Sequence, residues 1–154
     1  MAHKETIQHH YLKQVFTGSN HIFTVSTNVG YGCKNMREDV RLVQFFINSA
    51  IDDLGEDWKR APKRLEEDGL FGGKTWGAVK SFQKYTEGAV VDGMITPANG
   101  KRMYTPSHKY VYTIYYLNWY YFIQRPQFFD DLRRDPKLPG ELREYFGRPL
   151  PNLM

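Results

Sequence analysis

The stretch that decides the fold lies at positions 68–83 and reads DGLFGGKTWGAVKSFQ. It opens with Asp68-Gly69, a dipeptide typical of tight turns, because glycine adopts backbone angles that a Cβ would forbid. Two more glycines then precede a run with helical periodicity, which predicts a helix over residues 74–85. The residues expected to face the core of this unit are Phe71, Thr75, Ala78, Val79 and Phe82.

Parts of this pattern occur elsewhere in the chain. Positions 40–44 and 79–83 share the order Val-x-x-apolar-Gln, and Asp92-Gly93 repeats the turn of Asp68-Gly69. The segment around positions 40–44 predicts a helix over residues 35–51, capped by Asn35. We interpret the pattern as one structural unit that is used about twice.

The sequence around these units predicts a mainly α fold with short β segments at the N-terminus. Residues 9–17 and 21–29 are rich in β-formers and flank a turn at residues 18–20. Residues 52–67 are charged and contain a proline, which indicates a loop. Thr96-Pro97 predicts the start of a third helix that ends near Met103, since threonine caps helices and proline favours their first position.

The last third of the chain is rich in aromatic residues. The run over residues 110–123 has helical spacing, whereas its aromatic content favours a strand. We favour a helix that packs on the core, and docking to a partner protein remains the alternative for this aromatic face. A final helix is predicted over residues 139–146. The run at residues 110–123 is too short to span a bilayer.

Composition limits the possible chemistry. The 154 residues carry 21 Lys and Arg against 17 Asp and Glu, and residues 101–154 supply the whole excess. Cys33 is the single cysteine, so an internal disulfide is excluded and a passive thiol is the simplest interpretation. The five histidines lack the spacing of metal ligands, so we expect no metal and no cofactor. Residues 66–68 are acidic, but a solvated loop explains them better than glycosidase chemistry.

Three segments together resemble a known family. They read VRLVQFFI, DGLFGGKTWGAVKSFQ and VVDGMITP, and this order is similar to the small three-helix peptidoglycan-binding domain of bacterial and phage cell-wall proteins. The resemblance covers residues 29–104. Residues 1–28 and 105–154 would then be an extended N-terminal segment and an aromatic C-terminal extension. The motif is carried by Val40, Val43, Gln44, Asp68, Gly69, Phe71, Gly72, Thr75, Val79, Phe82, Gln83, Asp92 and Gly93.

The chain departs from the family pattern in three places. Residues 52–67 look like an insertion, Thr96 stands where the family has a glycine, and Gly73 stands where it often has a proline. The resemblance implies a non-catalytic domain that holds glycan or stem peptide on a shallow surface. The ligand-surface candidates are Arg41, Phe45, Trp58, Trp76 and Tyr104. The alternative is that the aromatic extension covers these residues.

The leading functional hypothesis is therefore a peptidoglycan-binding protein without enzymatic activity. The N-terminus has no apolar signal core, so delivery to the wall would need phage lysis or a secretion or injection machine. The expected partners are peptidoglycan and, through the extension, a protein; we expect neither nucleic acid nor a membrane span. The alternative is an interaction module that keeps the fold without binding the wall. A small wall hydrolase has the least support.

Overall fold

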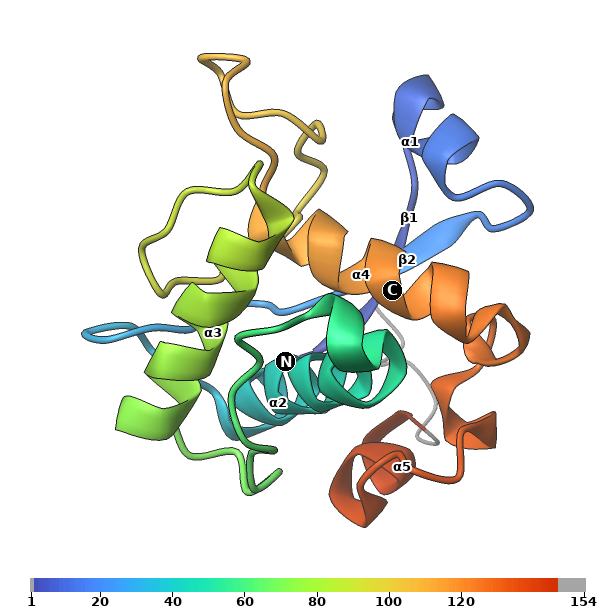
Figure 1. Cartoon of the computed structure of the whole chain (residues 1–154). Coiled ribbons are helices and arrows are strands. Elements are labelled where there is room, and N and C mark those ends of the chain that lie inside the picture. Colours follow the sequence, from blue (N-terminus) through green and yellow to red (C-terminus); the bar gives the residue numbers. More distant parts are fainter. Residues whose placement is uncertain (1, 147–154) are drawn as a thin grey trace.

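The computed structural model describes residues 2–146, so the end of the predicted C-terminal extension lies outside the described residues. The fold is mainly helical with one small antiparallel sheet (Figure 1). The strands and helices are β1 (His3–Thr6), α1 (His10–Val15), β2 (His21–Thr24), α2 (Arg37–Leu54), α3 (Gly73–Thr86), α4 (Thr113–Gln124) and α5 (Gly140–Phe146). Short 3-10 turns occupy Gly55–Asp57, Pro126–Phe128 and Leu132–Arg134.

Helix α2 lies at the centre of the fold. Every residue from position 42 to position 50 is buried, because α3, α4 and α5 all pack against this helix (Figure 1). Val40, Val43 and Ile47 are fully buried along one face of the helix. The predicted cap is wrong: α2 begins after Met36, and Asn35 instead has a positive φ of 51°.

The predicted Asp-Gly turn between α2 and α3 is held by one buried carboxamide. Gln44 Nε2 donates to Asp68 Oδ1 and to the Leu70 carbonyl, both at 3.2 Å. The same nitrogen lies 3.1 Å from Thr75 Oγ1 in the first turn of α3. Gln44 Oε1 accepts the Gly69 N–H at 2.9 Å. The N–H of Leu70 lowers the pKa of Asp68, with a smaller contribution from Gln44.

A second carboxamide makes the same set of bonds between α3 and α4. Gln83 Nε2 donates to Asp92 Oδ1 at 3.0 Å and to the Met94 carbonyl at 3.1 Å. It lies 3.0 Å from Thr113 Oγ1, at the start of α4. Gln83 Oε1 accepts the Gly93 N–H at 2.9 Å. The predicted repeat is thus a physical unit in which a glutamine ties its own helix to a turn and to the next helix.

The predicted third helix over residues 96–103 is wrong. Residues 96–103 are not helical, because Ile95 pairs with Val29 in an isolated antiparallel bridge and the chain then turns. The helix that follows the second Asp-Gly turn is α4, which begins at Thr113. It lies in the segment predicted to be an extension, so the unit built from α2, α3 and α4 continues past residue 104. The helical interpretation of the aromatic run is confirmed.

The N-terminal segment also differs from the prediction. The strands are β1 and β2, paired with His3 opposite Thr24 and Thr6 opposite His21. Residues 10–15 are predicted to be extended but form α1. Leu12 and Phe16 are four residues apart and both are buried, so a helix places the two side chains on the same inward face. Asn118 of α4 then completes β2: its side chain accepts the Phe23 N–H and donates to the Phe23 carbonyl, both at 2.7 Å.

The C-terminal part is fastened to α2 by a buried ion network. Arg125 donates to Asp135 at 2.7 Å and to both carboxylate oxygens of Asp53, at 2.7 and 3.1 Å. Tyr121 donates to the same oxygen of Asp135 at 2.8 Å. Burial raises the pKa of Tyr121, and its hydrogen bond to Asp135 adds to the rise. One contiguous hydrophobic core joins all these segments.

Candidate functional site

The larger of two described hollows is a groove of about 660 Å³ along the outer side of α3. One wall is α3 itself, and the other is the turn at residues 57–60, which belongs to the segment predicted to be an insertion. The lining residues are Asp57, Trp58, Lys59, Arg60, Trp76, Gly77, Lys80, Ser81, Lys84, Tyr85 and Glu87. None of these residues comes from residues 105–146, so the described part of the aromatic C-terminal segment does not line the groove.

Helix geometry explains the wall formed by α3. Trp76, Lys80 and Lys84 follow one another at intervals of four residues, so their side chains lie on one face of the helix. The Lys80 ammonium lies 4.2 Å from the centre of the Trp76 ring, within the range of a cation–π contact. The helix therefore presents an indole and two ammonium groups to the groove.

The Trp76 indole is held by two neighbours. A Cβ at Gly93 would lie 2.4 Å from Trp76 Nε1, so only glycine lets the second Asp-Gly turn approach the ring this closely. Tyr31 lies 5.4 Å from the indole, ring centre to ring centre. It belongs to a loop closed by Asn35, whose side chain bonds both the N–H and the carbonyl of Gly30 at 2.8 Å. The half-buried indole is thereby fixed in place.

The opposite wall is ordered by packing and by local hydrogen bonds. The Trp58 ring packs edge-on against Phe82 at 5.9 Å and tilts against Tyr85 at 5.6 Å. Ser81 Oγ donates to the Arg60 carbonyl at 3.1 Å, which ties the turn directly to α3. The two walls therefore keep a set separation.

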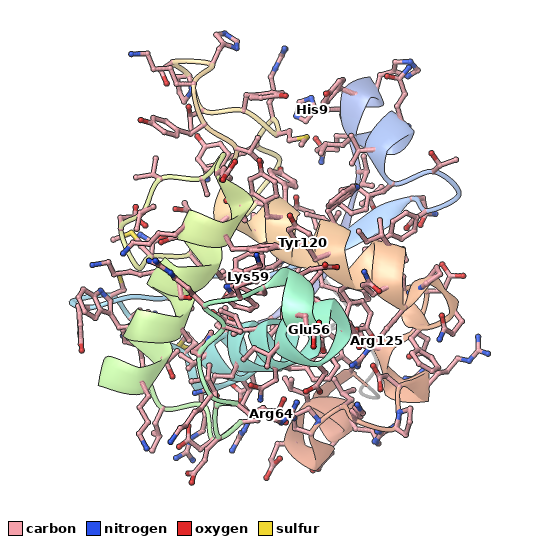
Figure 2. All side chains as sticks on the ribbon, viewed as in Figure 1. His9, Glu56, Lys59, Arg64, Tyr120 and Arg125 are labelled. Carbon is pink, nitrogen blue, oxygen red and sulfur yellow. The ribbon has the colours of Figure 1, made fainter. Side chains whose placement is uncertain are left out.

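Charge gives the groove its chemical character. Lys59, Arg60, Lys80 and Lys84 line it against two acids, Asp57 and Glu87. Lys59 and Lys84 are exposed, and Figure 2 shows Lys59 beside α3. Ammonium and guanidinium groups donate to carboxylate and phosphate oxygens, while an aromatic ring offers an apolar face. The groove is therefore suited to an anionic ligand that also has an apolar face.

The structure brings two of the five predicted site residues together. Trp58 and Trp76 line the same groove, although Trp58 is only 3% exposed. The prediction for Phe45 is wrong, because its ring is 1% exposed and lies 5.8 Å from that of Tyr121. The C-terminal aromatic segment therefore covers Phe45, as the alternative interpretation held.

The other two predicted residues lie outside the groove. Arg41 donates from Nε to the Glu67 carbonyl at 3.2 Å and lies 4.0 Å from Glu141, so its charge already serves internal contacts. Tyr104 is exposed, but it lies against Tyr11 at 6.1 Å between ring centres, beside a different part of the chain.

Sequence reasoning missed Lys59, Lys84 and Tyr85. The intervals of four residues between Trp76, Lys80 and Lys84 could have revealed the α3 face. The wall at residues 57–60 had no comparable signal, because its position depends on contacts with α3. A smaller hollow of about 450 Å³ lies at the N-terminal end of α3, and the side chain of Thr75 there is already bonded to Gln44.

Within residues 2–146, no group of three or more His, Cys, Asp and Glu side chains has the arrangement of a metal site. Among the same residues, no helix is both long and apolar enough to cross a membrane. No protein-family model matches the chain, and neither a curated protein nor a solved structure is significantly similar to it.

Proposed function

We propose that this chain is a non-catalytic module that binds peptidoglycan through the groove between α3 and residues 57–60. The observation that carries the proposal is the groove itself, which is lined by four cations, two acids and three aromatic side chains. Peptidoglycan combines sugar rings, which pack on aromatic faces, with stem-peptide carboxylates, which pair with ammonium and guanidinium groups. The walls of the groove are held by contacts within the chain, so little ordering is needed on binding.

The arrangement of α2, α3 and α4 supports the same proposal. These three helices are joined by two Asp-Gly turns, each held by a glutamine of the preceding helix. This is the kind of unit that the sequence resemblance implies, with a longer connection before its third helix.

The test is co-sedimentation of the purified chain with insoluble peptidoglycan sacculi at low and moderate salt. Lys59→Glu combined with Lys84→Glu reverses two exposed charges of the groove and should lower the bound fraction at least about ten-fold. Lys63→Glu is the matched control, because Lys63 is exposed but lines neither described hollow. Trp76→Ala should also weaken binding, with its thermal midpoint measured to confirm folding.

Three results would contradict the proposal. Equal binding by the groove variant and the Lys63 control would remove the groove from the interaction. No binding at either salt concentration would favour the alternative, a protein-interaction module without wall binding. Clearing of wall-containing gels by the chain would contradict the non-catalytic part.

A further inference from the structure

A second surface lies at the end of the molecule from which α1 projects. It consists of residues 6–20, which contain α1, and residues 96–112, the long connection before α4; we call these two segments the arm. Figure 1 shows α1 and this connection, coloured gold, projecting from the same end of the fold. They meet where His9 Nε2 lies 2.7 Å from the Gly100 carbonyl, and Figure 2 places His9 between them.

The connection in the arm is an ordered structure. Tyr104 and Val111 form an isolated antiparallel bridge, and the Thr105 N–H donates to the Tyr110 carbonyl at 2.8 Å. The tip turns at His108, whose φ is 59° and whose N–H donates to the Thr105 carbonyl at 2.8 Å. The side chains at the tip are therefore presented from a defined backbone.

The arm carries the whole net charge of the protein. Its cations are Lys13, Lys101, Arg102 and Lys109, and neither segment contains an aspartate or glutamate. The arm thus has four positive charges, and the rest of the chain has 21 − 4 = 17 basic residues against 17 acidic residues. Glu5 lies at its base, where its carboxylate accepts the Gly100 N–H at 3.1 Å.

Three of these cations are available to a ligand. Lys13, Arg102 and Lys109 are exposed, and none of them takes part in the ion pairs of the described residues. The fourth, Lys101, donates to the Pro97 carbonyl at 3.2 Å. Because the two segments contain no acid, their positive charges repel one another without compensation from the arm itself, and a multivalent anion would relieve the repulsion.

The arm also carries three exposed tyrosines. Tyr11 is 51% exposed, Tyr104 is 42% exposed and Tyr110 is 41% exposed. Their rings offer flat apolar faces, and their hydroxyl groups can donate to anionic oxygens. The arm therefore combines a positive potential with hydroxyl donors on one ordered surface.

We propose that the arm binds a linear polyphosphate, a polymer whose negative charge is carried by phosphate groups that bear no bases. Lysine predominates over arginine here, and its ammonium acts as a point charge for phosphate oxygens without demanding paired geometry. A protein partner is less well matched, because lysine is depleted at protein–protein interfaces. No residue of the arm lines the groove between α3 and residues 57–60, so this inference is independent of the proposed wall binding.

The test uses fluorescence anisotropy of the full chain with labelled inorganic polyphosphate. If the three available cations contact phosphates at about 0.7 per contact in the salt slope, affinity falls roughly twenty-fold between about 50 and 200 mM salt. The triple change Lys13→Glu, Arg102→Glu and Lys109→Glu should abolish binding. The groove change Lys59→Glu with Lys84→Glu is the matched control; it reverses charge elsewhere and should retain most of the affinity.

Four results would overturn the proposal. No binding of polyphosphate by the unmodified chain would overturn it directly, and an equal loss in the groove control would show only a response to net charge. Equal affinity for polyglutamate would remove the preference for phosphate. Tighter binding of a single-stranded oligonucleotide, lost on Tyr11→Ala with Tyr104→Ala, would show that bases stack on the rings and that the ligand is a nucleic acid.

Discussion

Replacing Gln83 with alanine should destabilise the chain by about 3–5 kcal/mol. The change leaves the buried Gly93 N–H without its acceptor, which costs about 1–3 kcal/mol, and it removes the bonds to the Met94 carbonyl and to Thr113, each contributing about 1 kcal/mol. For a chain of this length, that loss corresponds to a decrease in Tm of roughly 6–20 °C.

Urea unfolding followed by far-UV circular dichroism measures the change. Gln44→Ala is the matched comparison, because Gln44 makes the equivalent bonds at the first turn, and the two losses should agree within about 1 kcal/mol. Gln124→Ala, at the exposed end of α4, should change stability by less than about 0.5 kcal/mol. A Gln83→Ala loss as small as that of Gln124→Ala would refute the argument that these carboxamides hold the turns.

Three further predictions follow from the same structure. Gly93→Ala should destabilise the chain by about 2 kcal/mol or more, because φ at Gly93 is +72° and the new Cβ would clash with the Trp76 indole. Gly77→Ala should stabilise the chain by about 0.5–1 kcal/mol, because Gly77 lies inside a helix with open space around the new Cβ. Urea unfolding measures both changes. Arg125→Met should destabilise by about 3–5 kcal/mol by leaving two carboxylates unpaired, against less than about 1 kcal/mol for Arg133→Met at an exposed pair. Burial lowers the pKa of His21, so thermal stability should fall as the pH drops below about 6.5, and this decrease should be absent in His21→Gln.

The outcomes that contradict these predictions are distinct. Equal effects of alanine at the two glycines would mean that the close approach to the indole has no energetic consequence. A loss for Arg125→Met no larger than that for Arg133→Met would show that the buried network is dispensable. For His21, the folded chain releases the proton more readily than the unfolded chain, so stability that increases on acidification from pH 7 to pH 5 would reverse the predicted sign.

Local signals determined much of the helical core. The Asp-Gly turns and the buried face of α3 depend on neighbours within a few turns of the chain. Backbone angles and helical periodicity are therefore enough to predict them. The helical character of α4 could also be inferred, because the spacing of its core residues outweighs the strand preference of aromatic rings.

At several positions, contacts between segments far apart in the sequence override the structure that the local sequence favours, and only the tertiary structure shows this. Thr96-Pro97 reads as a helix start, but the pairing of Val29 with Ile95 places that segment in an extended path. Phe45 is buried because α4 lies over it, although its position on α2 looked free. The groove and the arm likewise depend on contacts between distant segments, and such contacts leave no periodic signal along the chain.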